Sequence, residues 1–336
     1  MEFILTCQEH NRKLTIYEFQ LYDKTFEFKE WLDDEVGLAH TDLKIEELVE
    51  LIINKPIIFI RHIFKIDVIF DRNNEEHYID GILKLCHQEL ALDSTFSIQM
   101  RCSKKAYQRT KGIPAFIAGE LNKYNYKLDV KKSEQIVSIY MSADFVYAGI
   151  SLSVHNISHW NGGAPHYSPT SEFNFISRAE YKLLDTAECF GIDFIKMKTG
   201  LDLGAALGGW TKVLTDYNIK TASVDPHKLD SKIAKRKKVR YYQMTAEQYL
   251  KMNFEAKYDI ILNDMKIDVD RSIKILISFQ EKLNESGLVV TTFKLPHQFA
   301  YKSILANINS LTSAGYKLVG AKQLFHNRSE ITVVLK

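Results

Sequence analysis

From residue 178 to the end of the chain, short apolar runs alternate with stretches whose apolar residues recur at helical spacing. The strand-like runs are GLDLG, TASVD, KYDIILND, GLVVTTFKL and SEITVVLK, and the helical stretches include SRAEYKLLDTAECF, GWTKVLTDY and DRSIKILISFQEKLNE. Such alternation is typical of a mostly parallel sheet covered by helices on both faces. We therefore predict an α/β fold with a doubly wound, Rossmann-like sheet for residues 177–336.

The upstream part of the chain follows another pattern and predicts smaller α+β regions. Residues 1–89 combine the helical stretch TDLKIEELVELIIN with the β-rich run KPIIFIRHIFKIDVIF, and residues 90–157 read as strands around a helix. Residues 158–176 are rich in Gly, Pro and Ser, as linkers are. We expect two N-terminal domains, a linker and the C-terminal sheet domain.

Charge is distributed unevenly along the chain. The formal net charge is only +2, but residues 1–90 hold 10 Lys and Arg against 19 Asp and Glu, a balance of −9. Residues 91–165 hold 9 against 5 (+4), and the remainder holds 25 against 18 (+7). The later two segments would attract a polyanion. The alternative is that charged residues are unevenly spread over the surface without a role in binding.

The cysteines and the hydropathy restrict the compartment. The four cysteines lie far apart without a CxxC pair, which argues against a disulfide framework and against a zinc site. No apolar run approaches the length of a membrane span, and we expect a cytoplasmic protein without membrane contact. His155, His159 and His166 lack a matched Cys or acidic set, so we expect loop histidines and no bound metal.

The stretch LDLGAALGGW, residues 201–210, runs from a strand into a loop with three glycines. Gly204, Gly208 and Gly209 are spaced G-x-x-x-G-G, which is neither the dinucleotide fingerprint nor a P-loop. Asp225 ends the next strand, where a carboxylate can accept two hydrogen bonds from a ribose diol. A nucleoside without a pyrophosphate fits this pattern, and S-adenosylmethionine is the expected cofactor. A glycine-rich turn that binds nothing is the alternative.

The C-terminal motifs resemble a known family. SRAEYKLLDTAECF, LDLGAALGGWTKVL, SVDP, NDMKID, TTFKLPHQ and AKQLFHNRSEITVVL resemble, in this order, the FtsJ/RrmJ-type RNA ribose 2′-O-methyltransferases. Among these the chain is most similar to the RlmM-like enzymes, which methylate 23S ribosomal RNA and carry a THUMP domain. The resemblance covers residues 177–336 and, more weakly, a THUMP-like stretch near residues 90–155.

The resemblance implies a catalytic set and a cofactor site. The family's Lys-Asp-Lys-Glu set corresponds to Lys182, Asp264, Lys294 and Glu330. In the methyltransferase variant of this fold the last strand runs antiparallel, so its beginning lies beside the ends of the other strands. We expect Lys294 to be the base for the ribose hydroxyl, with Asp264 orienting it. The residues expected at the cofactor are Gly204, Ala205, Ala206, Gly208, Gly209, Trp210, Asp225, Thr245 and Asp264.

The sequence departs from the family pattern in two places. Leu207 stands where the loop usually has proline, which removes a fixed φ and restores an N–H. Thr245 stands where related enzymes have an acid for the adenine amino group, with Glu247 two residues further on. Backbone groups around Met244 and Thr245 are the alternative adenine contact.

Two basic stretches predict contact with a structured RNA, which the resemblance implies to be ribosomal RNA. The run HKLDSKIAKRKKVR packs seven cations into 14 residues, which suits phosphate contact or a solvated helix face. In the THUMP-like stretch five cations surround Tyr107: Arg101, Lys104, Lys105, Arg109 and Lys111. The mixture of cations with an aromatic ring favours RNA.

Three other functions remain compatible with these patterns to different degrees. A catalytically degenerate RNA-binding protein is suggested by Leu207 and Thr245, and the complete catalytic set speaks against it. The same chemistry could act on tRNA. Base methylation would require an Asn/Asp-Pro-Pro-Tyr/Phe loop after the fourth strand, or a catalytic cysteine, and NDMKID supplies neither.

Overall fold

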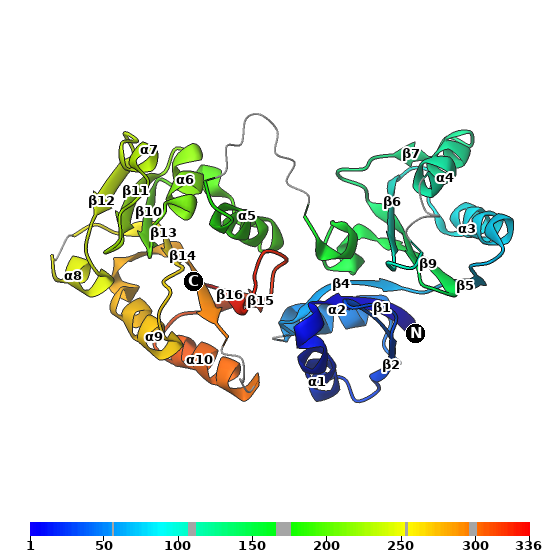
Figure 1. Cartoon of the computed structure of the whole chain (residues 1–336), viewed down its shortest axis with the longest axis horizontal. Helices are drawn as coiled ribbons and strands as arrows, with labels where there is room; N and C mark the ends of the chain where they lie inside the picture. The colour runs from blue at the N-terminus through cyan, green and yellow to red at the C-terminus, as the bar shows by residue number, and fades with distance from the viewer. Residues whose placement is uncertain (56, 107–111, 166–175, 253–254, 296–300) are drawn as a thin grey trace. The chain divides into compact units, whose positions relative to one another are not determined.

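A computed structural model describes residues 1–55, 57–106, 112–165, 176–252, 255–295 and 301–336 (Figure 1). Two compact units divide the chain, at residues 1–166 and 167–336. The first contains a four-stranded and a five-stranded sheet, and the second contains one seven-stranded sheet. Among the described residues, no helix has the length and apolar character needed to cross a membrane.

The four-stranded sheet has the β-α-β-β-α-β order of a split βαβ fold. Its strands pair antiparallel in the order β2-β3-β1-β4. Alternation along β1 sends Phe3 and Leu5 into the core with the helices, whereas Ile4 faces the other way. The elements are β1 (Glu2–Cys7), α1 (Arg12–Tyr22), β2 (Glu27–Trp31), β3 (Val36–His40), α2 (Ile45–Asn54) and β4 (Ile60–Lys65).

The five-stranded sheet has the order β5-β9-β8-β6-β7, with β6 parallel to β7 and β8 and the other pairs antiparallel. Helices α3 and α4 pack on one face of it. Its other face meets the first sheet, where Ile4 and Phe64 contact Tyr140 and Tyr147. The elements are β5 (Val68–Asp71), α3 (Glu75–Glu89), β6 (Thr95–Cys102), α4 (Ile113–Asn122), β7 (Lys127–Leu128), β8 (Gln135–Met141) and β9 (Phe145–Leu152).

The chain passes from the first sheet to the second between Lys65 and Val68, and both sheets belong to one compact unit. The run KPIIFIRHIFKIDVIF contributes to both sheets, since its residues 60–65 form β4 and its residues 68–70 begin β5. The described start of the expected linker also packs on the second sheet. Gln99 Nε2 donates to the carbonyl of His159 at 2.6 Å, and Asn161 Nδ2 donates to that of Met100 at 2.7 Å.

The seven-stranded sheet has the order β12-β11-β10-β13-β14-β16-β15. Strands β10 to β14 are parallel, and β16 is antiparallel to both of its neighbours. Helices α5 and α6 cover one face, and α9 and α10 lie on the other (Figure 1). This topology confirms the Rossmann-like α/β class expected for residues 177–336.

The bounds of these elements follow the alternation of the sequence. The strands are β10 (Thr199–Leu203), β11 (Lys220–Val224), β12 (Val239–Tyr242), β13 (Tyr258–Asn263), β14 (Leu283–Lys294), β15 (Leu318–Lys322) and β16 (Glu330–Leu335). The helices are α5 (Ala179–Cys189), α6 (Gly209–Asp216), α7 (Ser231–Ala234), α8 (Ala246–Lys251), α9 (Val269–Ser278) and α10 (Tyr301–Ser313). The four cysteines are free thiols.

A buried histidine on β4 gives the first unit a defined acid sensitivity. Burial lowers the pKa of His62 to about 3, and the nearby charge of Arg101 acts in the same direction. In the unfolded chain His62 has the ordinary pKa of 6.5. Between pH 6.5 and 3 it is therefore protonated in the unfolded chain and neutral in the folded unit. Stability contributed by neutral His62 is therefore present at neutral pH and lost as the pH falls through this window.

We predict that His62→Gln reduces the acid sensitivity of the protein. The wild type should lose about 2 kcal/mol more unfolding free energy than the variant between pH 7.5 and pH 5, since each pKa unit corresponds to about 1.4 kcal/mol. Urea denaturation followed by circular dichroism at both pH values measures the difference. Equal losses in both proteins would contradict the assignment.

Candidate active site

The four charged residues of the expected catalytic set come from four different elements. Asp264 directly follows β13, Lys294 ends β14, Glu330 begins β16, and Lys182 lies in α5. Lys294 and Glu330 are direct cross-strand partners in the antiparallel pair β14–β16. The reversal of β16 therefore brings its first residue to the edge where the parallel strands end.

Hydrogen bonds join the four side chains into one group, called here the tetrad. Lys182 Nζ donates to Asp264 Oδ2 at 2.7 Å and to Glu330 Oε1 at 2.9 Å. Lys294 Nζ lies 2.5 Å from both Asp264 Oδ1 and Glu330 Oε2. Each ammonium thus bridges both carboxylates, so positive and negative charges alternate and the formal charges cancel. This pairing compensates the burial of the charges.

The tetrad fixes the protonation of its members. Burial by itself would raise the pKa of Asp264, but the charges of Lys294 and Lys182 outweigh it, so this pKa lies below its usual value. Burial by itself would lower the pKa of Lys294, but Asp264 and Glu330 raise it above its usual value. Lys294 is therefore an ammonium in the free protein at neutral pH, although it is the most exposed member, with 29% of its side chain accessible.

Thr292 is a tetrad contact that we did not predict from the sequence. Its hydroxyl donates to Asp264 Oδ1 at 2.7 Å and accepts from Lys294 Nζ at 2.9 Å. The signal was available, because residues two apart on a strand face the same side and Thr292 precedes Lys294 by two. Thr292 fixes the direction in which both partners point.

The glycine loop lies directly beside the tetrad. The amide of Asp264 donates to the carbonyl of Leu203, and a Cβ on Gly204 would stand 2.8 Å from the Cα of Met265. Gly204 also has a positive φ of 81°. The end of β10 and the segment after β13 are thus packed backbone to backbone, which requires glycine at this position.

Asp225 is bound to the same loop. Its Oδ2 accepts from the amide of Ala206 at 3.0 Å, and its Oδ1 accepts from the amide of His227 at 2.7 Å. A carboxylate has about four acceptor positions, so these bonds leave capacity for a diol. The residues present therefore fit a nucleoside ligand. Asp225 has a second role that we did not foresee, since it fixes the loop.

Two residues that we expected at the cofactor, Trp210 and Gly209, have packing roles between α5 and α6. Trp210 is 2% exposed, and its Nε1 donates to the carbonyl of Ala179 at 2.6 Å. A Cβ on Gly209 would meet Ser177 Oγ at 2.3 Å, so this glycine lets α5 approach α6. Both residues therefore hold the helix that carries Lys182 against the glycine loop.

The buried carboxylate of Glu180 reinforces this junction and was not predicted. Its Oε1 accepts from the amide of Ser177 at 3.0 Å, and its Oε2 lies 3.1 Å from Lys212 Nζ on α6. The side chain of Glu180 is fully buried, so the contact with Lys212 compensates a charge that would otherwise be costly.

Thr245 has a local structural role. Its hydroxyl accepts from the amide of Gln248 at 3.2 Å, and the side chain of Gln248 bonds back to the amide of Thr245, which together form a capping box for α8. Glu247 is paired with Arg271 at 2.6 Å. The side chains considered for the adenine contact are thus bonded within the protein, which favours the backbone around Met244 for that contact.

A third aspartate of the region, Asp202, was not predicted from the sequence. It lies in β10 and is 1% exposed, and its Oδ2 accepts from Thr211 Oγ1 at 2.6 Å. Burial raises the pKa of Asp202 to about 7, with a further contribution from the charges of Asp264 and Asp225. Because an aspartate inside a strand reads as a departure from the apolar pattern, its position in LDLG was the available signal.

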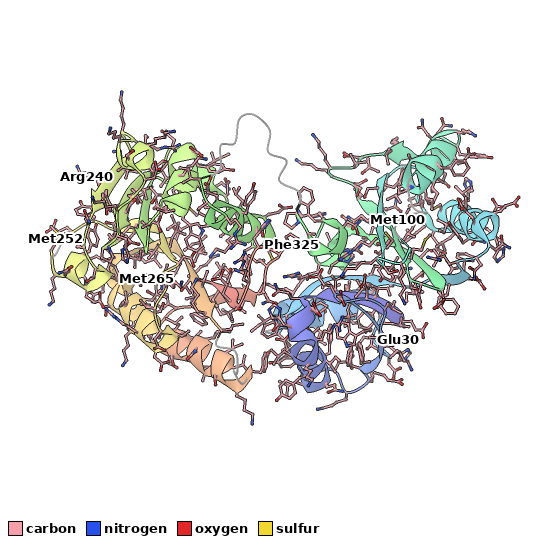
Figure 2. All side chains as sticks on the ribbon, viewed as in Figure 1. Glu30, Met100, Arg240, Met252, Met265 and Phe325 are labelled. Carbon is pink, nitrogen blue, oxygen red and sulfur yellow. The ribbon has the colours of Figure 1, made fainter. Side chains whose placement is uncertain are left out.

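A loop contact outside the tetrad secures Glu330. His326 Nδ1 lies 2.6 Å from Asp185 Oδ2, and its ring stacks on Tyr181 with the centroids 4.9 Å apart. Tyr181 and Asp185 belong to α5, as Lys182 does. The loop before β16, which also carries the exposed Phe325 (Figure 2), is thereby held to the helix that supplies one lysine of the tetrad.

The residues expected to contact RNA in the first unit are partly paired with acids and partly outside the described residues. Arg101 Nη2 lies 3.6 Å from Glu35, and Lys104 Nζ lies 2.9 Å from Asp34, so both cations are paired with acids of the connection between β2 and β3. Tyr107, Arg109 and Lys111 lie outside the described residues. Such exposed pairs are weak and do not prevent phosphate contact.

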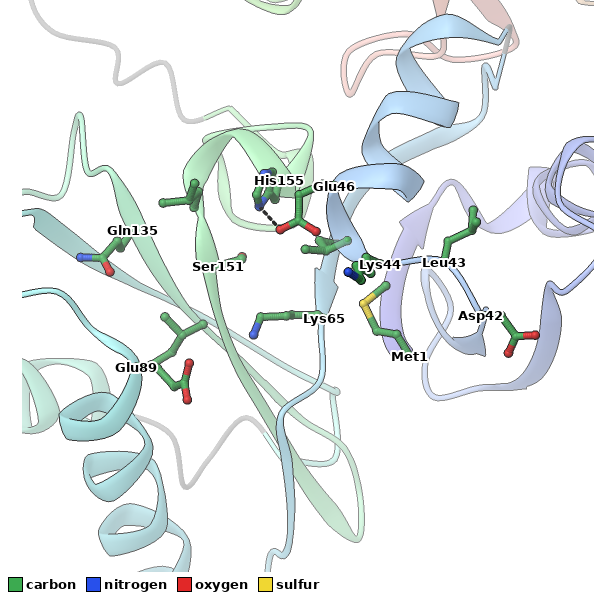
Figure 3. A pocket seen from close by; sticks show the side chains of 13 residues that line it. Met1, Asp42, Leu43, Lys44, Glu46, Lys65, Glu89, Gln135, Ser151 and His155 are labelled. Carbon is green, nitrogen blue, oxygen red and sulfur yellow. Dashed lines mark ion pairs between the residues drawn. The ribbon is translucent and has the colours of Figure 1, made fainter.

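The first unit contains a pocket of about 600 Å³ lined by residues of both its sheets (Figure 3). His155 Nδ1 lies 3.8 Å from Glu46 Oε1 there, and Lys65 pairs with Asp67 at 2.8 Å. Within the described part of the chain no cluster of three metal-ligating side chains occurs. His166 lies outside the described residues.

Comparison with known proteins shows what the sheet domain is similar to. Residues 175–305 match the family model described as FtsJ-like methyltransferase. Ribosomal RNA large subunit methyltransferase M of Stutzerimonas stutzeri is 27% identical over 228 residues, which cover 61% of this chain and 60% of that protein. Ribosomal RNA large subunit methyltransferase E of Rickettsia bellii is 32% identical over 110 residues, which cover 30% of this chain and 48% of that protein.

The similarity is partial in length. The chain spans about half the length of the curated relatives that it matches. A solved structure, TrmN from Thermus thermophilus, aligns with 100% of this chain and 99% of its own at 13% identity, with a TM-score of 0.39.

We predict that Asp202→Asn stabilises the protein increasingly as the pH rises. The folded pKa of about 7 exceeds the ordinary 3.8, so ionisation of Asp202 costs stability between pH 3.8 and 7. Asparagine keeps an acceptor for Thr211 and cannot ionise. The stability of the variant relative to wild type should rise by about 3 kcal/mol from pH 5 to pH 8, since about two pKa units of this window lie below the folded pKa. Urea titrations at both pH values test this, and a constant difference would contradict it.

Proposed function

We propose that this chain, whose C-terminal unit is an S-adenosylmethionine-dependent methyltransferase domain of the FtsJ type, methylates the 2′-hydroxyl of a ribose in RNA, with ribosomal RNA as the substrate. The observation that carries this proposal is the tetrad itself. Two lysines and two carboxylates meet beside the glycine loop, at the edge where doubly wound sheets bind their ligands.

The chemistry of the reaction explains these residue types. When bound, S-adenosylmethionine supplies a methyl group on a positively charged sulfonium. The ribose hydroxyl is a weak acid, so its attack requires a fixed direction of approach and a group that accepts its proton. Asp225 and the glycine loop hold the nucleoside, and Asp264 links that loop to the two lysines.

Lys294 is the proposed proton acceptor, and its environment defines when it can act. Its raised pKa keeps it charged in the free protein, where Asp264 and Glu330 both stabilise the ammonium. Any positive charge added beside Asp264 competes for that carboxylate and lowers the pKa of Lys294. Lys294 therefore becomes a better base when a positively charged ligand occupies the site beside Asp264.

Lys182, Glu330 and Thr292 act as positioning residues in this proposal. Lys182 binds both carboxylates, Glu330 holds both lysines, and Thr292 contacts Asp264 and Lys294. An RNA-binding protein without catalytic activity would not need this complete set. The tRNA alternative involves the same tetrad, and it is separated from ribosomal RNA by the substrate tests below.

Residues 90–157 are assigned the role of an RNA-docking, THUMP-like region. The assignment rests on the net charge of residues 91–165, which hold 9 Lys and Arg against 5 Asp and Glu, a balance of +4. Docking by a separate region would explain why residues upstream of the methyltransferase domain exist in the same chain.

The function is tested by mapping ribose methylation. Total RNA from cells with and without this protein is compared at nucleotide resolution, and the purified full chain is then given RNA from the deficient cells. A site that is lost in the cells and restored by the protein supports the proposal and separates ribosomal RNA from tRNA. Methyl transfer to a base instead of a ribose would refute it.

We predict that Lys294→Ala and Asp264→Ala each reduce single-turnover methylation at least about 100-fold, the lower range for loss of a general acid–base group. Cofactor binding by the Lys294→Ala variant should remain near wild type. Lys266→Ala, which removes an exposed lysine two residues after Asp264, is the matched control and should leave the rate unchanged. Retention of most activity in either variant would remove that residue from the mechanism.

We predict that Asp225→Ala weakens binding of S-adenosylmethionine by about 1–3 kcal/mol, the range for lost hydrogen bonds to a charged group. The variant loses the contact with the loop amide of Ala206 as well as the acceptors for the ribose. Titration calorimetry measures the effect, with the exposed Asp270→Ala as the control. Unchanged affinity would exclude Asp225 from the cofactor site.

A further inference from the structure

The C-terminal unit also contains a pocket, which lies at the edge of the sheet opposite to the tetrad. Its volume is about 610 Å³, within the range of ligand sites. Thr199, Lys220 and Tyr258 in its lining are the first residues of three parallel strands, β10, β11 and β13. The tetrad lies where such strands end. No step of the proposed reaction uses this pocket, which we call the amino-edge pocket.

The lining of the amino-edge pocket is strongly basic. Five cations and one acid, Glu255, contribute to it. The cations are Lys220, Lys237, Lys238, Arg240 and Lys257. Four of the five are exposed, and none of the five forms an ion pair with a described residue, although Lys238 Nζ donates to the carbonyl of Asn218 at 3.1 Å. The positive charge is therefore not neutralised within the described protein.

The basic run of the sequence is divided by the fold. Arg236 is paired with Asp216 at 2.6 Å, and Lys232 lies in α7. Lys237 and Arg240 instead line the amino-edge pocket, where Arg240 lies on the edge strand β12 (Figure 2). Lys220 and Lys257 join them from distant parts of the sequence. The pocket is thus a folded feature and not a solvated helix face.

The polar groups of the pocket are poorly suited to reading a base. The hydroxyls of Tyr249 and Tyr258 lie 2.5 Å apart and bond each other. The hydroxyl of Thr221 donates to the carbonyl of Ile219. These three hydroxyls are thus already bonded within the protein, so recognition falls to the cations, which suit phosphate groups.

We propose that the amino-edge pocket binds the phosphate backbone of the RNA substrate at a point remote from the methylated nucleotide. This proposal rests on the proposed function and extends it. The five residues of β10, at about 3.3 Å each, separate the two edges by about 17 Å. At about 3.4 Å per stacked nucleotide, the bound phosphates lie at least about five nucleotides from the target.

The test compares variants of equal charge in the full chain. Lys237→Gln combined with Arg240→Gln removes two exposed cations of the pocket. The matched control, Lys274→Gln with Lys302→Gln, removes two exposed lysines from α9 and α10. The probe is a fluorescein-labelled 20-nucleotide oligouridylate, and its affinity is measured by anisotropy from 50 to 200 mM salt. Cofactor affinity is measured by calorimetry.

The pocket variant should bind the oligouridylate at least about tenfold more weakly. The slope of log affinity against log salt should fall by about 1.4, which corresponds to two lost contacts with a single strand. The control should keep wild-type affinity, and all proteins should bind the cofactor equally. An unchanged pocket variant, or a control that loses as much, would overturn the proposal.

Two further outcomes distinguish the occupant and the underlying function. If uridine monophosphate binds as tightly as the oligouridylate and the pocket variant abolishes this, the site takes a small anion and the RNA proposal is wrong. If the wild type methylates RNA but the pocket variant binds RNA normally, the proposed role of the amino-edge pocket is wrong and the proposed function is supported. If the pocket effect is found but no ribose is methylated, the function fails and the RNA-binding site stands.

Discussion

The antiparallel insertion of β16 is the constraint on which the candidate active site depends. A parallel strand in that place would begin at the opposite edge of the sheet, and Glu330 would lie remote from Lys294. With the reversal, the two residues are direct partners across β14 and β16. The fold thereby supplies a carboxylate from the beginning of one strand to a lysine at the end of another.

The charge pattern at that edge follows from the need to keep four ionised groups close together. Each lysine contacts both carboxylates, so none of the four is buried without a partner of opposite sign. The carboxylates that stabilise the Lys294 ammonium also oppose its loss of a proton, because they raise its pKa. Under the proposed mechanism, the contacts that stabilise the free protein would therefore also oppose the action of Lys294 as a base.

The sequence predicted those features that depend on strand order and strand ends. Alternating apolar runs indicated the sheet, and the ends of its strands indicated where Asp264 and Lys294 would lie. The capping role of Thr245 had a sequence signal that we did not use, because in TAEQ a threonine is followed three residues later by a glutamine, the pattern of a capping box. The amino-edge pocket joins Lys220 to Lys257, and only the pairing of β10 with β11 and β13 brings these segments together.

Three carboxylates at neighbouring strand ends have a consequence for product release. Asp202, Asp225 and Asp264 lie at the ends of β10, β11 and β13, and the latter two raise the pKa of the first. The charge of Asp264 is compensated within the tetrad, but the negative charge of Asp225, with that of Asp202 above its pKa, favours a cationic ligand over a neutral one of the same shape. Transfer of a methyl group from a sulfonium removes one positive charge, so we expect the spent ligand to be held less firmly than the fresh one. The same edge of the sheet would thus favour both the binding of the charged donor and the release of the spent ligand.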